Sequence, residues 1–184
     1  MGRYQVYVYA ICKNEAQFAR RWMESMGEAD GVYVLDTGSD DGTPQRLEEL
    51  GATVAVEQVT PWRFDQARNR SLALVPEEAD ICVCTDLDEV FRPGWRAEVE
   101  AAWPQVKTRL HYRYVWSFLP DGRPGISFWA DKIHCRKGCR WVGPVHEVLR
   151  FDQGEGQRVY AQGVTLEHYP DHSKPRSQYL PLLE

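Results

Sequence analysis

Two aspartates near the middle of the chain, Asp86 and Asp88, have the residue type and spacing of a metal site. They follow the apolar run 79–85, which predicts a buried strand. In an extended segment these side chains would share a face, and adjacent carboxylates repel one another unless a cation lies between them. Oxygen ligands favour Mg²⁺, Mn²⁺ or Ca²⁺ over zinc. The pattern predicts a metal site that binds a phosphate-bearing substrate. The alternative is an ordinary acidic turn at the end of a strand, without a metal.

A second polar turn, residues 36–43, follows the predicted strand 31–35 and precedes a helix that Pro44 opens. Asp36 stands at the end of that strand, where a carboxylate can accept hydrogen bonds from a base or a ribose. The small residues of the turn would let the backbone approach a ligand closely. The alternative is a turn that only caps the next helix, since Asp and Ser are favoured there.

The first half of the chain alternates strand-like and helix-like segments. We expect strands at 4–11, 31–35, 53–56 and 79–85, and helices at 15–26, 44–50 and 64–74. Such alternation predicts a mostly parallel sheet with helices on both faces. In sheets of this kind ligands bind at the carboxyl ends of the strands, which is where both polar turns lie.

After Pro93 the pattern changes to a helix at 95–103 followed by aromatic, alternating segments. These segments, at 111–118, 126–135, 141–151 and 159–167, are separated by turn residues and predict antiparallel hairpins. We therefore expect one α/β domain over 1–184, with a nucleotide-binding half at 1–92 and a β-rich half at 93–184. Residues 178–184 have the pattern of the first turns of an amphipathic helix, which ends with the sequence. A truncated chain and a short natural tail are both compatible with this.

Bulk properties exclude several classes of protein. The 184 residues are 43% hydrophobic and 27% charged, as in an ordinary globular domain. A formal net charge of -5 disfavours a nucleic-acid-binding role, which normally requires a basic surface. The sequence has neither a run long enough for a transmembrane segment nor a signal-peptide core, so we expect a cytoplasmic protein.

The five cysteines are an odd number, and Cys12, Cys82 and Cys84 lie in apolar segments. Small buried hydrophobic residues in a reducing compartment are the expected interpretation. Cys135 and Cys139 flank a Lys-Gly turn next to a histidine, which is also compatible with zinc. A second ligand pair at zinc spacing is missing, so a hairpin that carries two thiols is favoured.

Six short motifs occur in the order and spacing of one family. They are Cys12-Lys13-Asn14-Glu15, the turn 36–43, Ala67-Arg68-Asn69, Asp86-Leu87-Asp88, the segment 141–147 with His146-Glu147, and Glu167-His168-Tyr169. With these motifs the chain resembles family 2 glycosyltransferases of the GT-A fold over nearly its whole length. The resemblance implies a metal-dependent, inverting enzyme that transfers a sugar from a nucleotide-sugar donor, most often a UDP-sugar, to an acceptor hydroxyl that the sequence does not identify.

The resemblance also implies roles for donor-binding residues. Asn14 and Glu15 match the loop that lies against uridine, and Asp36 matches an acid that contacts the base or ribose. Many relatives carry a second aspartate where this chain has Thr37, so the resemblance does not extend to that position. Arg68 matches a basic residue near the base and the diphosphate. The alternative is an arginine on the exposed face of a helix, without a role in binding.

For the metal, Mn²⁺ or Mg²⁺, the resemblance implies direct binding by Asp88. Asp86 would face the ribose or the waters of the metal, and His168 would be a further ligand, with His172 as its alternative. Glu89 would help to position the metal ligands without binding the metal itself. The ion would neutralise the charge that develops on the departing nucleoside diphosphate.

An inverting transfer also needs a base for the acceptor hydroxyl. The resemblance points to Glu147, with His146 orienting it or contacting a phosphate, and Asp131 is the runner-up. One or two of the tryptophans, among them Trp116, would offer a platform for an acceptor sugar.

Two other classes remain open. A sugar nucleotidyltransferase would show a glycine-rich basic loop where this chain has residues 12–15. A non-catalytic module would bind a nucleotide-sugar or a glycan without turning over a donor.

Overall fold

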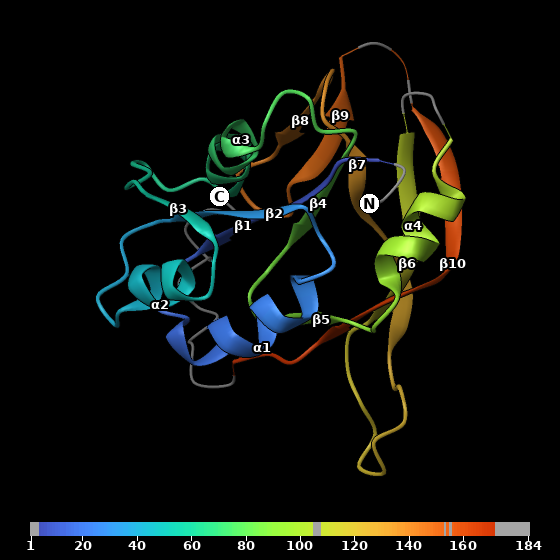
Figure 1. Ribbon diagram of the computed structural model, residues 1–184, viewed down its shortest axis with the longest axis horizontal. Coiled ribbons are helices and arrows are strands. Elements are labelled where there is room, and N and C mark those ends of the chain that lie inside the picture. The colour runs from blue at the N-terminus through green and yellow to red at the C-terminus, as the bar shows by residue number, and fades with distance from the viewer. Residues whose placement is uncertain (1–3, 105–107, 153, 155, 172–184) are drawn as a thin grey trace.

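The computed structural model describes residues 4–104, 108–152, 154 and 156–171. They form an eight-stranded sheet with helices on both faces, and a separate two-stranded sheet (Figure 1). His172 and the amphipathic segment 178–184 lie outside the described residues. None of the helices that are described has the length and apolar character that a membrane-spanning segment needs.

The N-terminal half has the alternating order that the sequence predicts. Its strands are parallel and lie in the order β3-β2-β1-β4: β1 (Val6–Cys12), β2 (Gly31–Asp36), β3 (Thr53–Val56) and β4 (Ile81–Thr85). The helices are α1 (Ala16–Met26), α2 (Thr43–Glu49) and α3 (Phe64–Leu74). Cys12 pairs with Asp36 and Ala10 with Thr85, so these strands end at the same edge of the sheet.

The C-terminal half extends the same sheet with antiparallel pairs. It contains β5 (Glu89–Phe91), α4 (Trp95–Ala102), β6 (Thr108–Val115), β7 (Ser127–Cys135) and β10 (Gln157–His168), and the sheet continues from β4 in the order β7-β6-β10-β5. The hairpin of β8 (Cys139–Val142) and β9 (Val148–Phe151) stands apart. The predicted fold class is therefore confirmed: an α/β domain with a mostly parallel half and a β-rich half.

Two sequence expectations are wrong in detail, and one strand was not expected. The segment 141–151 is two strands joined by the loop 143–147, which Gly143 enters at a φ of 117°. The three-residue β5 has no signal of its own in the sequence. Asp86 and Asp88 are not in an extended segment, because β4 ends at Thr85 and the Glu89 amide donates to the Asp86 carbonyl at 3.1 Å, closing a tight turn.

The core lies on both faces of the sheet. Helix α1 buries Ala19, Trp22 and Met26, which helical spacing places on one stripe, against the face of β1 that carries Val8. Helices α2 and α4 cover the same face, whereas α3 and the β8–β9 hairpin cover the opposite one (Figure 1). Burying a side chain as large as Trp22 contributes about 2–3 kcal/mol, so α1 is held mainly by packing.

A buried polar chain links the sheet to the β8–β9 hairpin. The Trp141 indole N–H donates to the Tyr9 hydroxyl at 2.7 Å, and that hydroxyl lies 2.7 Å from Nε2 of His134. Nδ1 of His134 lies 2.8 Å from the Cys135 carbonyl, so the neutral ring donates there and accepts from Tyr9. Burial lowers the pKa of His134 to about 4. The histidine is therefore neutral at pH 7.

All five cysteines are free thiols. Cys12, Cys82 and Cys84 are buried as expected, and burial raises the pKa of Cys82 to about 12 and that of Cys84 to about 11. Such thiols are inert at neutral pH.

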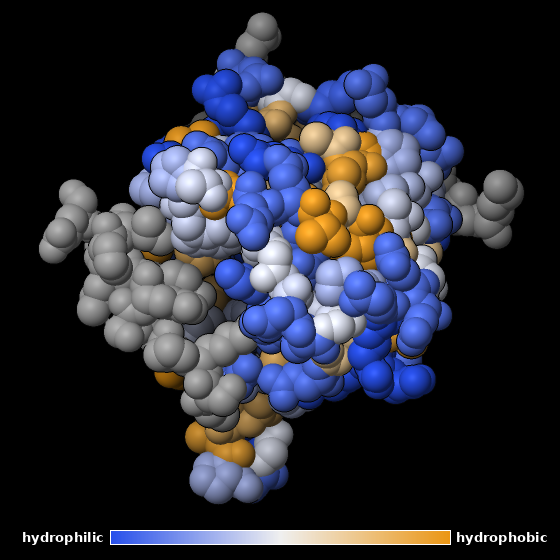
Figure 2. All heavy atoms as spheres, turned by 90° about the vertical axis from the view of Figure 1, so that its left-hand side faces the viewer, coloured by the Kyte–Doolittle hydropathy of each residue, from blue (hydrophilic) through white to orange (hydrophobic). Residues whose placement is uncertain are grey.

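The β6–β7 hairpin extends beyond the body of the molecule (Figure 1). Its exposed large hydrophobic residues are Trp116, Leu119, Ile126, Phe128 and Trp129. Figure 2 shows hydrophobic colour on the protrusion at the bottom of the molecule.

Candidate active site

A cleft of about 1220 Å³ opens at the edge where β1 and β4 end. It is lined by residues from both halves of the chain. Those predicted from the sequence that line it are Asn14, Glu15, Arg68, Asp86, Asp88, Glu89, Trp116, His146, Glu147 and His168. Segments far apart in sequence therefore converge on one space, as the order of motifs predicts.

The β1–α1 loop forms one wall and is tied to the turn 36–43. Asn14 has a φ of 54°, an uncommon conformation for a residue other than glycine. Its amide donates to Ser39 Oγ at 2.7 Å, and its side-chain oxygen accepts from the Asp40 amide at 2.9 Å. The Glu15 amide donates to Thr43 Oγ1 at 2.8 Å. The two loops thus form one rigid wall.

Asp36 does not line this cleft. It is fully buried, and one oxygen accepts from the amides of Gly38 and Ser39 at 2.9 and 2.8 Å. The other accepts from the Ser39 hydroxyl at 2.5 Å and the Cys12 thiol at 3.3 Å. The carboxylate therefore holds the turn together, and Thr37 faces the cleft in its place.

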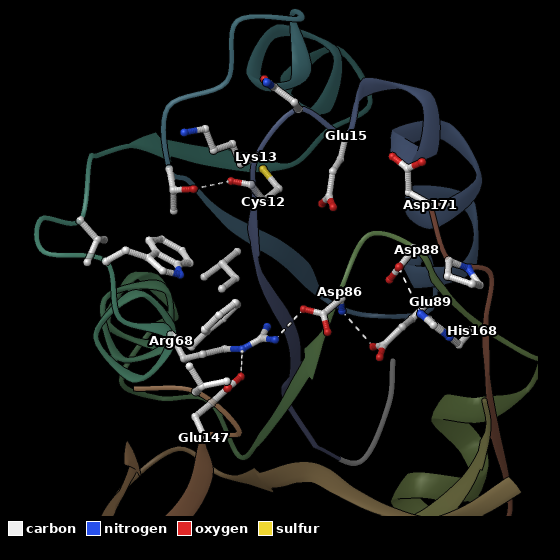
Figure 3. Close-up of a pocket in the computed structure, with 18 of the residues that line it drawn as sticks. Cys12, Lys13, Glu15, Arg68, Asp86, Asp88, Glu89, Glu147, His168 and Asp171 are labelled. Carbon is white, nitrogen blue, oxygen red and sulfur yellow. Dashed lines mark hydrogen bonds and ion pairs between the residues drawn. The ribbon is translucent and has the colours of Figure 1, made fainter. Parts of the chain in front are cut away.

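Arg68 connects the two sides of the cleft (Figure 3). It projects from α3 and is 3% exposed. Its Nη2 donates to Asp86 at 2.6 Å, while its Nε donates to Glu147 at 3.0 Å. Burial would raise the pKa of Asp86, but the charges of Arg68 and Lys132 outweigh burial and hold that pKa well below its usual range. Asp86 is therefore ionised and already neutralised by protein cations.

Lys132 and Tyr114 are cleft residues that sequence reasoning missed. Lys132 Nζ lies 3.2 Å from Asp86 and 3.4 Å from Glu89. Glu89 is 1% exposed, accepts from the Tyr114 hydroxyl at 2.8 Å and from the Asp86 amide at 2.9 Å, and so braces the turn. Lys132 lies in an alternating strand without a motif, so the pairing of β4 with β7 was the missing information.

Asp88 and His168 meet on the opposite side of the turn (Figure 3). The Asp88 carboxylate lies 3.2 Å from His168 Nε2. His168 Nδ1 lies 3.2 Å from the Trp116 carbonyl, and the Trp116 ring stacks on the imidazole at 4.5 Å between centroids. Burial opposes charge on His168, but the hydrogen bond and charge of Asp88 outweigh burial and raise the pKa of His168.

This pair fits a divalent cation. A histidine that donates one ring N–H to a backbone carbonyl presents its other nitrogen to a metal in a fixed direction. Within the described residues, no group of three or more His, Cys, Asp or Glu side chains is placed to hold a metal ion, at this turn or beside Cys135 and Cys139. Mg²⁺ needs only one or two protein ligands when substrate phosphates and waters complete its shell.

Glu147 reaches the cleft on the loop 143–147, which α3 fixes in place. The Phe64 amide donates to the Pro144 carbonyl at 3.0 Å, and the Gly143 amide to Asp65 at 2.9 Å. Asn69 forms two bonds with the backbone of Trp141, each of 2.9 Å.

His146, next to Glu147, is exposed and has a φ of 55°. It lines the cleft beside Glu147, and strained backbone of this kind often marks a functional site. Asp131 is instead paired with Arg109 at 2.7 Å and does not line the cleft.

Comparisons with known proteins agree with this architecture. No family model matches the chain. It is 26% identical over 152 residues to a TPR repeat-containing protein of Synechococcus elongatus, a match that covers 79% of this chain and 35% of that protein. Among solved structures, a mycobacterial protein superposes with a TM-score of 0.64 and 16% identity over 96% of this chain and 70% of its own. That match shows the fold.

Glycosyltransferases are also among the solved structures that the chain resembles. Glucosyl-3-phosphoglycerate synthase from Mycobacterium tuberculosis, in complex with Mg²⁺ and uridine diphosphate, matches with a TM-score of 0.49 and 24% identity, over 61% of this chain and 44% of that one. The chain thus spans about a third of the curated relative and less than half of the synthase. The function has to be inferred from the residues of the cleft.

Proposed function

We propose that this chain is the catalytic domain of a metal-dependent, inverting glycosyltransferase that uses a nucleoside-diphosphate sugar, in the first instance a UDP-sugar. The single observation that carries the proposal is the Asp88–His168 pair, at 3.2 Å, in a cleft shared with Arg68 and Glu147. Residues 1–92 would hold the donor, and 93–184 would carry the acceptor side. A cytoplasmic location is part of the same proposal.

The charges around the turn support the need for a metal ion. Two cations, Arg68 and Lys132, form ion pairs with three carboxylates: those of Asp86, Glu89 and Glu147. Asp88 adds a fourth carboxylate beside them. A diphosphate that entered this cleft alone would meet a surplus of negative charge. A divalent ion held by Asp88 and His168, with Mn²⁺ or Mg²⁺ as candidates, would reverse that surplus and supply the charge that stabilises the departing diphosphate.

The remaining residues would position the reactants. The wall of Asn14, Glu15 and Thr37 would hold the nucleoside. Arg68 would hold Asp86 near the ribose and keep Glu147 at the opposite side of the sugar. Glu147 would then accept the proton of the acceptor hydroxyl as the hydroxyl oxygen attacks the anomeric carbon, which breaks the bond to the diphosphate.

Calorimetry with UDP tests the donor site directly. We expect binding in Mn²⁺ that EDTA abolishes and that Asp88→Ala weakens at least about tenfold, because one charged ligand is lost. Asp121→Ala is the matched control, since Asp121 is an exposed carboxylate on the hairpin that pairs only with Arg123 among the described residues. Affinity indifferent to both EDTA and Asp88→Ala would contradict the metal site.

Turnover then separates the alternatives. Release of UDP from UDP-sugars supports transfer or hydrolysis, release of pyrophosphate indicates a nucleotidyltransferase, and binding without any product indicates a binding module. If UDP does not bind, the same titration with GDP decides whether another base is used.

A further inference from the structure

Lys132 brings an ammonium group into the cleft that no motif of the sequence includes. The side chain leaves β7 beside the end of β4 and is 26% exposed. Its Nζ lies 3.2 Å from Asp86 and 3.4 Å from Glu89. Lys132 contacts the turn that presents Asp88, and both residues line the cleft in which a diphosphate would need positive charge.

Among the residues that the structure describes, the Lys132 ammonium has one N–H donor without a partner. Lysine carries three N–H donors, and among the described residues Lys132 donates only to Asp86 and Glu89. Both contacts are longer than the 2.7–2.9 Å that is usual for charge-assisted bonds. The Lys132 ammonium is thus held in the cleft while part of its hydrogen-bonding capacity is left for a ligand.

Neither carboxylate depends on Lys132 alone. Asp86 keeps Arg68 at 2.6 Å, and Glu89 keeps the Tyr114 hydroxyl at 2.8 Å and the Asp86 amide at 2.9 Å. Lys132 can therefore turn toward a bound anion while its present partners remain hydrogen-bonded.

We propose that Lys132 binds the diphosphate of the donor, exchanging part of its contact with Asp86 for a phosphate oxygen. This inference rests on the proposed function, because it assumes that a nucleoside diphosphate occupies the cleft. The leaving group would then be neutralised from two directions, by the ion at Asp88 and His168 and by the fixed ammonium of Lys132.

Lysine acetylation of the wild-type protein tests the contact without a variant. Peptide mass spectrometry would follow the modification of Lys132 and of Lys137, an exposed lysine in the β7–β8 turn. With Mn²⁺, saturating UDP should slow acetylation of Lys132 at least about threefold, whereas saturating uridine should not. Lys137 should be unaffected by either. Equal acetylation of Lys132 with and without UDP would overturn the proposal.

Variants give the second test. Lys132→Met should weaken UDP at least about tenfold, in line with the loss of a charged hydrogen bond, and leave uridine unchanged. Lys132→Arg, which keeps the charge, should stay within about threefold of wild type. Lys137→Met removes one exposed lysine charge and serves as the control.

The outcomes are distinguishable. If the wild-type protein binds neither UDP nor GDP, the proposed function itself fails. If the wild-type protein binds UDP and Lys132→Met binds it equally well, only the role of Lys132 fails. Equal weakening of UDP and uridine would indicate a structural role and would also overturn the inference. If Lys132→Met does not fold, the acetylation result and Lys132→Arg decide.

Discussion

At the scale of single residues, the cleft is organised by ion pairs that cross it. Arg68 holds carboxylates from two distant segments, and Glu89 braces the turn that presents Asp88. A buried guanidinium with two partners is costly to leave unpaired, so its contacts fix the positions of both acids. Arg68 thereby holds Glu147 near the proposed sugar position, and no contact from His146 is needed for this.

Glu147→Gln tests the base. The amide keeps the size of the side chain and an oxygen for Arg68 but does not accept a proton at neutral pH. We expect transfer to fall by about 10²–10⁴-fold, the usual contribution of a general base, while UDP affinity changes by less than about threefold. His146→Ala is the neighbouring control and should cost far less in rate. Normal turnover by Glu147→Gln would exclude the assigned role.

The sequence identified Asp86 and Asp88 because they directly follow an apolar strand, whereas Arg68, Glu147 and His168 were predicted only from the family resemblance. It could not show the direction of a side chain. Asp36 has the right type and position, yet its oxygens point into the turn. Lys132 has no such signal, since its place beside Asp86 arises from the pairing of two strands about fifty residues apart in the chain, Val83 with Ile133.

At the scale of elements, α3 and the β8–β9 hairpin act as one support for the loop 143–147. Asn69 connects them through both ends of its amide, at 2.9 Å each. Asn69→Ala should therefore lower the free energy of unfolding by about 2–3 kcal/mol, from two lost hydrogen bonds and the backbone groups left unpaired. Chemical denaturation measures this value.

Arg70→Ala, in the same helix, is the comparison. Among the described residues, Arg70 forms only an exposed ion pair with Glu57, so its loss should cost at most about 1 kcal/mol. Equal losses in the two variants would show that the Asn69 amide does not fix the hairpin.

The buried His134 makes stability depend on pH. Its folded pKa of about 4 lies below the usual value near 6.5, so the unfolded chain binds the proton more readily. The stabilisation is complete above pH 6.5 and is lost as pH falls toward 4. At pH 5 the loss of this stabilisation should amount to about 2 kcal/mol. The drop in unfolding free energy from pH 7 to pH 5 should shrink by that amount in His134→Gln, and an unchanged drop would contradict it.

At the scale of the whole molecule, one sheet runs through both halves. β4 pairs with β1 on one side and with β7 on the other, and one core cluster contains residues of α1, α4 and β6. We expect a single unfolding transition in guanidinium chloride, with coincident curves from tryptophan fluorescence and far-ultraviolet circular dichroism. Two separated transitions would show that the halves are independent units.

The strand–helix order of the N-terminal half followed from the sequence, because apolar segments alternate there with amphipathic ones and turn residues separate them. The order β7-β6-β10-β5 did not, since alternation predicts strands but not their neighbours. The break between Val142 and Val148 was missed because Gly143 and Pro144, which mark the bend, were taken as part of one segment between the apolar residues on either side.

The fork of Arg68 has a consequence for kinetics. A guanidinium is planar and rigid, so a rotation that tightens its bond to Asp86 loosens its bond to Glu147. A donor that contacts Asp86 would shift Arg68 and so weaken the Arg68–Glu147 bond before any acceptor binds. The two substrates would then enter in a compulsory order, donor first and acceptor second, and initial-rate patterns with a dead-end acceptor analogue would be uncompetitive against the donor.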